Sequence, residues 1–322
     1  MIEHICAEPD IYRIEVPLPH NPLRYLNSYV VRGRDRFLVI DTGFNRPECR
    51  EALFSGLASL HVDLARTDLF LTHLHADHTG LVGDFSRSGS RIYMHPDDYQ
   101  YLVDSADGST WRYAEEKSMP EEIKNQFSNQ ARKYSPDPSF TVRAVRDGER
   151  IQLAGTEFQV IHTPGHTKGL CCLYIPEKEI IFTSDHILFD ITPNIQYWYH
   201  MPDALERYLQ SLDKVYDLPV RLALPGHRKG DTSIAGRIDA LRKHHARRLD
   251  EVLQAAATHP GATAFELAPC LSWSMRGKLW AEFPPTQKWF AMGETLAHIE
   301  YLLHHGKLSR QEVGGMYRYY IV

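Results

Sequence analysis

The chain of 322 residues is longer than an average domain, and its composition, 43% hydrophobic and 24% charged, is that of an ordinary globular protein. No apolar run approaches the length that a membrane-spanning helix needs, so we expect no membrane partner. The net charge of −5 combines a mildly basic segment after residue 236 with a more acidic remainder, which is compatible with nucleic-acid contact but does not require it. The five cysteines show no C-x-x-C spacing and the start of the chain has no secretory h-region, which together predict reduced thiols and a cytoplasmic location.

Strand and helix signals alternate as far as residue 230, a pattern typical of an α/β sheet covered by helices. Strands are expected at residues 11–19, 27–31, 36–40, 69–72, 91–95, 141–145, 149–153, 157–162, 170–175, 179–183 and 221–224, and helices at 47–60 and 203–216. Residues 97–139 interrupt this alternation with polar and aromatic side chains. We interpret this insertion either as a lid or pocket wall, or as a helical excursion on the surface, and both interpretations stay open.

The segment Thr-His-Leu-His-Ala-Asp-His-Thr-Gly, at residues 72–80, carries the strongest chemical signal. It follows the apolar run at 69–71, so we expect a loop at the end of a buried strand. The side chains in it that can bind a metal are His73, His75, Asp77 and His78. Neutral imidazole and carboxylate are ligands that suit zinc and, to a lesser degree, iron or manganese.

Three further side chains of this kind each follow a predicted strand. They are His166 after 157–162, Asp185 after 179–183 and His227 after 221–224. Because ligands of open α/β sheets gather where strands end, we expect these loops to converge on one metal site. Proline and glycine precede both histidines, and their tight turns would hold an imidazole in place.

This pattern resembles that of the metallo-β-lactamase superfamily, whose H-x-H-x-D-H motif stands here at residues 73–78. The resemblance covers roughly residues 11–230, and it implies an αββα sandwich with a centre of two zinc ions, or of iron or manganese. It assigns three residues to each ion and one residue to both: His73, His75 and His166 to the first ion, Asp77, His78 and His227 to the second, and Asp185 as the bridge. Asp41, in an Asp-Thr-Gly turn, is similar to the family's acid beneath the site, which would orient a ligand imidazole through its other ring N–H.

The implied chemistry is hydrolysis. Two metal ions about 3.5–4 Å apart share a water whose pKa falls toward roughly 7, so metal-bound hydroxide is available at neutral pH. Asp77 is the expected catalytic residue, steering the attacking hydroxide. His186, next to the bridging aspartate, is interpreted either as a hydrogen-bond donor to the site or as a structural histidine.

Departures from the patterns of known subgroups narrow the substrate. Asp185 stands where many lactamases have cysteine, and Leu188 stands where relatives of the acyl-homoserine lactonases have tyrosine. Glyoxalase-II-like thioesterases share the metal residues, but their glutathione-binding tail has no match here. Persulfide dioxygenases bind one iron with the same loops, which leaves a mononuclear iron dioxygenase as a further alternative.

After residue 235 the pattern changes to helices and a terminal hairpin. Helices are expected at 231–258, from 263 to about 270 and at 286–305, followed by a hairpin of residues 307–312 and 316–322. This resembles the winged helix of a subgroup that includes lactamase-like endoribonucleases. We therefore predict a metallo-β-lactamase-fold domain at 1–235 and a winged-helix-like domain at 236–322. The basic residues Arg242, Lys243, Arg247 and Arg248 form either a nucleic-acid contact or an ordinary solvated face.

The expected function is therefore that of a dinuclear zinc hydrolase acting on a small ester, thioester or lactone. A metal-dependent phosphodiesterase or endoribonuclease is the alternative, and an iron dioxygenase is less favoured. Tyr197, Trp198 and Tyr199 suggest an apolar pocket wall near the metals, although ordinary core aromatics would give the same pattern. We expect a small-molecule substrate, do not favour nucleic acid as a partner, and leave a homodimer open.

Overall fold

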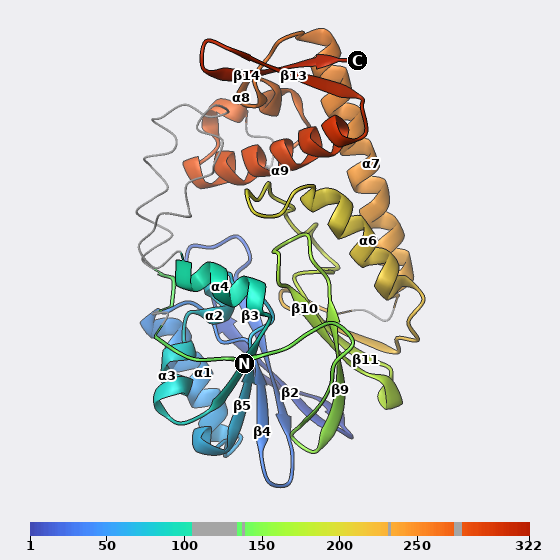
Figure 1. Cartoon of the computed structure of the whole chain (residues 1–322). Coiled ribbons are helices and arrows are strands. Elements are labelled where there is room, and N and C mark those ends of the chain that lie inside the picture. Colours follow the sequence, from blue (N-terminus) through green and yellow to red (C-terminus); the bar gives the residue numbers. More distant parts are fainter. Residues whose placement is uncertain (105–133, 137–138, 231–232, 274–278) are drawn as a thin grey trace.

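Residues 1–104, 134–136, 139–230, 233–273 and 279–322 are described by the structure, which is a computed structural model (Figure 1). Two β-sheets pack face to face, and helices cover the outer face of each sheet. The predicted αββα sandwich is therefore confirmed. A further unit of helices and a β-hairpin follows at the C-terminal end of the chain, at the top of Figure 1.

The first sheet has seven strands. In spatial order they are β1 (Ile2–Ala7), β2 (Asp10–Pro17), β3 (Tyr25–Arg32), β4 (Phe37–Ile40), β5 (Thr67–Phe70), β6 (Arg91–Met94) and β7 (Arg143–Ala144). Strands β1 to β4 pair antiparallel, whereas β4 to β7 run parallel, so the carboxyl ends of β4, β5 and β6 lie at one edge. β1 has no signal in the sequence, because it is an edge strand whose side chains are mostly exposed and do not alternate.

The second sheet has five strands. In spatial order they are β12 (Leu222–Pro225), β11 (Ile180–Ser184), β10 (Cys171–Ile175), β9 (Thr156–His162) and β8 (Arg150–Leu153). Neighbouring strands in this sheet pair antiparallel, except β11 and β12, which run parallel. The residues that follow β11 and β12 therefore leave the sheet at the same edge.

Strand β3 shows why both faces of the first sheet are apolar. Tyr29 and Val31 face the second sheet, where the ring of Phe182 packs edge-on against Tyr29 with 5.2 Å between ring centroids. Val30 belongs to the opposite layer, beneath helices α1 (Pro47–Ser59) and α3 (Val82–Arg87). Because successive side chains of a strand point to opposite faces, one apolar strand contributes to two cores.

The outer layer of the second sheet consists of α6 (Ala204–Tyr216) and α7 (Ile234–Thr258). On the first sheet, α4 (Pro96–Asp104) forms the beginning of the predicted insertion at 97–139. Residues 105–133 and 137–138 of that insertion lie outside the described part of the chain. Its interpretation as a lid, a pocket wall or a surface excursion therefore stays a prediction.

Helix α7 continues without a break into the C-terminal unit, which also contains α8 (Ala264–Leu267), α9 (Pro285–His304) and the antiparallel hairpin of β13 (Leu308–Val313) and β14 (Met316–Ile321). The predicted capping box opens α8, with Glu266 Oε2 accepting from the Thr263 N–H at 2.8 Å. Helix α7 packs in the core of the sandwich through Ile238 and in the core of the C-terminal unit through Val252, so one helix belongs to both parts. The predicted division of the chain after residue 235 therefore stays a prediction. The interpretation of the C-terminal unit as a winged helix also stays a prediction.

Of the four basic residues predicted to lie together on α7, two form ion pairs with acidic side chains. Arg248 is only 6% exposed and donates to Glu294 at 3.2 Å. Arg242 pairs with Asp239 and Asp213. The other two, Lys243 and Arg247, are exposed, so the basic surface is smaller than the sequence pattern suggests.

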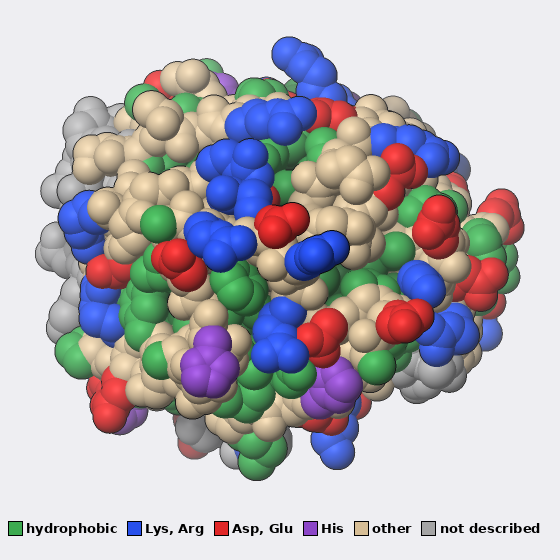
Figure 2. Space-filling view, turned by 90° about the horizontal axis from the view of Figure 1, so that it is seen from below, with side chains coloured by type: hydrophobic (Ala, Val, Ile, Leu, Met, Phe, Trp, Pro, Cys, Tyr) green, Lys and Arg blue, Asp and Glu red, His purple; other side chains and the backbone are tan. Residues whose placement is uncertain are grey.

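Figure 2 shows the end of the molecule that lies away from the C-terminal unit, where Lys and Arg side chains gather near the middle of the face. The turn between β3 and β4 lies at this end (Figure 1), and nearby arginines pair with carboxylates. Arg32 pairs with Asp10 at 2.7 Å, and Arg36 and Arg91 both pair with the buried Asp68. Among the helices of the described residues, none combines the length and the apolar character needed to cross a membrane.

Candidate metal centre

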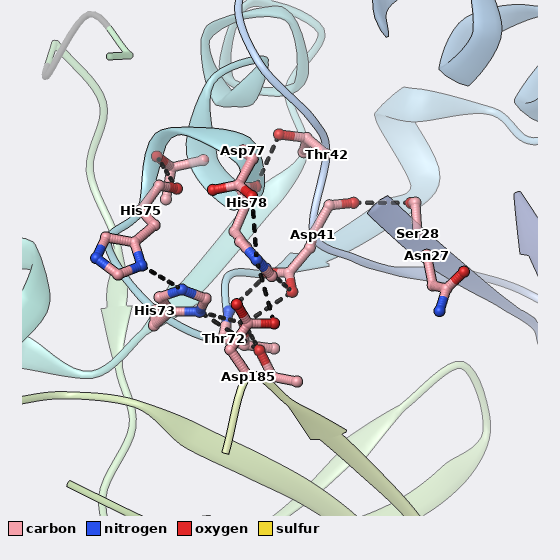
Figure 3. A network of polar contacts seen from close by, with 12 residues as sticks. Asn27, Ser28, Asp41, Thr42, Thr72, His73, His75, Asp77, His78 and Asp185 are labelled. Atoms are coloured by element: carbon pink, nitrogen blue, oxygen red, sulfur yellow. Dashed lines mark hydrogen bonds and ion pairs between the residues drawn. The ribbon is translucent and has the colours of Figure 1, made fainter. Parts of the chain in front are cut away.

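The loops that follow β5, β9, β11 and β12 meet at one edge of the sandwich and bring the seven predicted ligand residues together. Figure 3 shows the part of this cluster around His73, Asp77 and Asp185. Within each of three groups the possible donor atoms lie within 4.8 Å of one another: His73, His75 and His166; His73, His78 and Asp185; Asp77, His78 and His227. Because the groups share His73 and His78, they form one continuous cluster.

The first group consists of three imidazoles. His75 Nδ1 lies 3.0 Å from His73 Nε2 and 3.0 Å from His166 Nε2. These distances direct three ring nitrogens at a common point. All three side chains belong to loops that leave the carboxyl ends of strands.

Asp77, His78 and His227 are called the second group from here on, and Asp185 belongs to neither the first nor the second. His227 Nε2 lies 3.4 Å from Asp77 Oδ2. Asp185 lies between the two groups, with Oδ2 at 3.7 Å from His166 Nε2 and 3.4 Å from His227 Nε2, and Oδ1 at 3.6 Å from His78 Nε2. One carboxylate thus faces imidazoles of both groups.

Tight backbone turns bring these side chains together. Ser184, just before Asp185, and Asp41 have positive φ angles of 49° and 60°, a conformation that costs a residue with a Cβ about 1–3 kcal/mol. Gly226 precedes His227, and a Cβ at this position would lie only 2.6 Å from Asp185 Oδ1. The glycine therefore leaves the space that the carboxylate occupies.

Asn27, on β3 of the first sheet, holds the loop that carries His227. Its side-chain amide donates to the carbonyls of Pro225 at 2.9 Å and Arg228 at 2.7 Å. The neighbouring Ser28 hydroxyl donates to the Asp41 carbonyl at 2.8 Å (Figure 3). The first sheet thus fixes the position of a loop of the second sheet.

Asp41 lies beneath the cluster and is almost fully buried. Its Oδ2 accepts from His78 Nδ1 at 2.7 Å and from the Thr72 hydroxyl at 2.7 Å, and its Oδ1 accepts from the Thr72 N–H at 2.9 Å. Because Nδ1 of His78 donates to this carboxylate, Nε2 is the ring nitrogen that faces the cluster.

Backbone carbonyls orient two further imidazoles in the same way, since His166 Nδ1 donates to the Asn194 carbonyl and His227 Nδ1 to the Tyr25 carbonyl, each at 2.8 Å. Within the described residues, the buried atoms His78 Nε2, His227 Nε2 and Asp185 Oδ1 have no hydrogen-bond partner. A buried polar atom without a partner is costly, and imidazole and carboxylate are ligands of divalent ions. The residues present therefore fit a divalent metal.

The charges of the cluster divide between the two groups. Burial and the neighbouring His166 lower the pKa of His75 to about 3. Burial would raise the pKa of Asp77, but His78 and His227 bring it down to about 2. Burial would lower the pKa of His227, but Asp185 and Asp77 raise it to about 10. His75 is therefore neutral and Asp77 ionised at pH 7, which are the forms in which imidazole and carboxylate bind a cation.

Of the three aromatic residues predicted to form a pocket wall, the structure brings Trp198 to the cluster and not the other two. The Trp198 ring stacks on His75 with 6.2 Å between ring centroids, and its Nε1 donates to the His166 carbonyl at 3.1 Å. Tyr197 packs against the core of the C-terminal unit, and Tyr199 is 66% exposed. The loop runs between α9 and the cluster here, so neighbouring side chains point in different directions.

His186 is fully buried and packs edge-on against Tyr208 of α6 at 5.4 Å. Neither of its ring nitrogens has a hydrogen-bond partner among the described residues. His186 belongs to none of the three donor groups, and both interpretations of it stay predictions.

Asp98, in the first turn of α4, is a fully buried residue that sequence reasoning missed. Its Oδ2 accepts from the Leu74 N–H at 2.9 Å and the Thr167 hydroxyl at 2.7 Å, and its Oδ1 accepts from the Gly169 N–H at 2.6 Å. It therefore ties the histidine-rich loop after β5 to the loop after β9. The available signal was its position just after a predicted strand, the same rule that identified the other acids.

The family model of the metallo-beta-lactamase superfamily matches residues 22–227, which include the whole cluster. The chain belongs to the metallo-beta-lactamase superfamily. A second family model, described as the metallo-beta-lactamase-like C-terminal domain, matches residues 249–322.

Solved structures of metallo-beta-lactamase proteins share this fold over nearly the whole chain. A metallo-beta-lactamase family protein of Thermus thermophilus is 30% identical, with a TM-score of 0.81 over 97% of this chain and 98% of that one. A beta-lactamase domain protein of Burkholderia ambifaria is 24% identical, with a TM-score of 0.87 over 100% of this chain and 94% of that one. Such coverage includes the C-terminal unit.

Some curated relatives whose names state an activity come from Aspergillus species. An atrochrysone carboxyl ACP thioesterase of Aspergillus fumigatus is 29% identical over 230 residues, covering 68% of this chain and 59% of the relative. One of Aspergillus novofumigatus is 26% identical over 264 residues, covering 78% of this chain and 66% of the relative. The chain thus spans only about half to two thirds of the length of the curated relatives that it matches.

Proposed function

We propose that this metallo-beta-lactamase-fold protein is a metal-dependent hydrolase of a small acyl thioester. The observation that carries this proposal is the buried cluster of histidines and aspartates, whose donor atoms converge and in part lack hydrogen-bond partners among the described residues. Asp185 faces both groups, which supports a site for two ions. The names of the relatives support the thioester among the ester, thioester and lactone substrates that the sequence leaves open.

In this proposal the cluster holds two zinc ions, with iron or manganese as alternatives. The residues that would hold the first ion are His73, His75 and His166, those for the second are Asp77, His78 and His227, and Asp185 would contact both. Bound ions of this kind supply Lewis acidity, which activates water and polarises a carbonyl. Zinc is preferred because imidazole and carboxylate are its usual ligands in hydrolytic sites.

The protein's own residues position the reactants. Asp41 keeps the Nε2 atom of His78 turned toward the cluster. Asp77, whose low pKa of about 2 keeps it ionised, accepts a hydrogen bond from the attacking water and so directs it at the carbonyl carbon. The leaving group of a thioester is a thiolate, and a thiol pKa of about 8.5 lets it depart without prior protonation.

An apolar wall beside the cluster suits an acyl group. Trp198 stacks on His75, and the ring of Tyr101 lies edge-on to Trp198 with 5.4 Å between ring centroids. Binding sites for small molecules combine such apolar surfaces with a few polar groups that fix orientation.

The test measures thiol release from short acyl-coenzyme A thioesters by the full chain reconstituted with zinc. We expect release that stops when a chelator is added, and a loss of at least a hundredfold in His166→Ala. His4→Ala is the matched control, because His4 is a half-exposed histidine on β1 that contacts Asp10 and Tyr12 outside the cluster. The control should retain its activity and its metal content.

Two outcomes would overturn the proposal. Cleavage of single-stranded RNA without any cleavage of thioesters would favour a phosphodiesterase or endoribonuclease. A purified protein that binds one iron and no zinc would favour a dioxygenase.

A further inference from the structure

One turn of α9, from Phe290 to Glu294, contacts the loop that follows β11 at residues 194–197. The Tyr197 N–H donates to the Gly293 carbonyl at 3.0 Å. The side-chain amide of Asn194 donates to Glu294 Oε2 at 3.1 Å and to the Phe290 carbonyl at 3.3 Å. Backbone and side-chain hydrogen bonds thus fix this loop to α9.

The same loop contacts His166 from two sides. The Asn194 carbonyl accepts from the imidazole Nδ1 of His166 at 2.8 Å, and Trp198 Nε1 donates to the His166 carbonyl at 3.1 Å. Asn194 therefore connects α9, through its side chain, with the imidazole, through its carbonyl. The position of that carbonyl depends on where α9 holds the loop.

Glu294 is a well-fixed anchor for this connection. It is 8% exposed, and its Oε1 accepts from Arg248 Nε at 3.2 Å. Arg248 is itself held, since it donates to the Ser272 carbonyl at 2.6 Å and its guanidinium lies over the Trp273 ring at 4.2 Å. A buried carboxylate and guanidinium that satisfy each other are oriented more strictly than an exposed pair.

We propose that the C-terminal unit acts as a positioning module for the metal centre, in which Glu294 and Asn194 hold the imidazole of His166 in the orientation that binds metal. This role rests on the proposed function, in which His166 binds a divalent ion. Asn194 and Glu294 are positioning residues, because they act through the Asn194 carbonyl. Residues that hold the second nitrogen of a metal-binding imidazole typically contribute about 10–100-fold to metal affinity.

The readout is the dissociation constant for zinc, measured on the full chain by competition with a chromophoric chelator. Asn194→Ala removes both side-chain tethers but keeps the carbonyl, and we expect it to weaken zinc binding about tenfold. Asn194→Asp places a carboxylate against Glu294 and should weaken binding at least as much. Combining Asn194→Asp with Glu294→Gln restores the hydrogen bond between these two side chains with reversed polarity, but not the one to the Phe290 carbonyl, so this double variant should regain part of the affinity.

His304→Ala is the matched control. His304 contacts Asp203 at 3.0 Å, so this change also removes a contact between α9 and the sandwich, but at the residue that caps α6, nine positions after Asn194. We expect its zinc affinity to stay within twofold of the wild type. The melting temperatures of the metal-free variants show whether any loss of affinity merely follows a loss of folding.

The outcomes separate this role from the proposed function. Wild-type affinity in Asn194→Ala, or a double variant no better than Asn194→Asp, would overturn the positioning role and leave thioester hydrolysis standing. A tenfold loss with rescue, in a protein that releases no thiol from thioesters, would support the positioning role and overturn the substrate. A wild-type protein that binds no divalent ion would overturn both.

Discussion

Replacing Asp98 by asparagine is expected to destabilise the protein, because this carboxylate closes the gap between two loops of the metal centre. Its two oxygens accept from three donors: the N–H groups of Leu74 and Gly169 and the hydroxyl of Thr167. Asparagine has nearly the same size but only one oxygen. Whichever way its amide turns, an NH2 group faces at least one buried donor.

The structure sets the magnitude. The least disruptive orientation turns the NH2 group toward Gly169 and leaves that one N–H without an acceptor. An unsatisfied buried donor costs about 1–3 kcal/mol, so we expect a loss of up to about 2 kcal/mol. Out of a typical stability of about 5–15 kcal/mol, this is a readily measurable fraction.

The assay is urea unfolding of the full chain in the presence of a chelator. Burial raises the pKa of Asp98 to about 7, against the hydrogen bonds from Thr167, Gly169 and Leu74, so unfolding is measured at about pH 8.5, where the carboxylate is ionised. Asparagine also removes the cost of burying that charge, so about 2 kcal/mol is the upper bound of the expected loss. The matched control is Asp97→Asn, since this neighbouring carboxylate is 39% exposed and pairs with Lys168 at 3.5 Å. An exposed pair contributes about 0–1 kcal/mol. If the two variants differ by less than about 0.5 kcal/mol, the usual range of a neutral surface change, Asp98 does not hold the loops together.

Three further predictions concern metal and pH. Zinc at a hundred times its dissociation constant should raise the free energy of unfolding by about 2.7 kcal/mol. A melting temperature that changes neither with added zinc nor with added chelator would argue against the metal centre. Asp41→Asn should weaken zinc binding at least tenfold, because one amide oxygen cannot accept from His78 and from both Thr72 donors; an unchanged dissociation constant would contradict this. Burial and the stacked His162 lower the pKa of His95 to about 4. The folded protein then binds fewer protons than the unfolded chain, so its free energy of unfolding falls as pH falls from about 6.5 toward 4. His95→Gln should remove on the order of 2 kcal/mol of this loss. If the free energy of unfolding changes with pH by the same amount in both proteins, the prediction is wrong.

The sandwich and the cluster could be predicted because their signals are local. The metal-binding side chains of residues 73–78 stand next to one another in the sequence, and His166, Asp185 and His227 each follow a short apolar run. Such runs mark buried strands, and strand ends of one sheet meet at an edge.

The residues that escaped prediction act through distant neighbours. The donors that contact Asp98 lie 24 to 71 positions away in the sequence, so its position just after a predicted strand is a local signal of burial but does not identify them. Asn194 acts through a carbonyl, which every residue carries. Arg248 has the sequence pattern of a surface cation in its helix, and it is buried only because Ser272, Trp273 and Glu294 pack against it from later in the chain. Tyr197 and Trp198 are neighbouring aromatic residues that the sequence does not distinguish. They point to different parts of the molecule because the loop runs between α9 and the cluster.

The hydrogen bonds of Asn27 also constrain the order of assembly. They join residues 198 and 201 positions apart, and a closure of this span has an entropic cost that only later contacts can offset. His227 takes its place only when β12 has been added beside β11 and its loop has reached the first sheet. A nascent chain that emerges from the ribosome without residue 227 carries the H-x-H-x-D-H segment but not the finished cluster. We therefore expect tight metal capture to follow completion of the sandwich, rather than to guide its early folding.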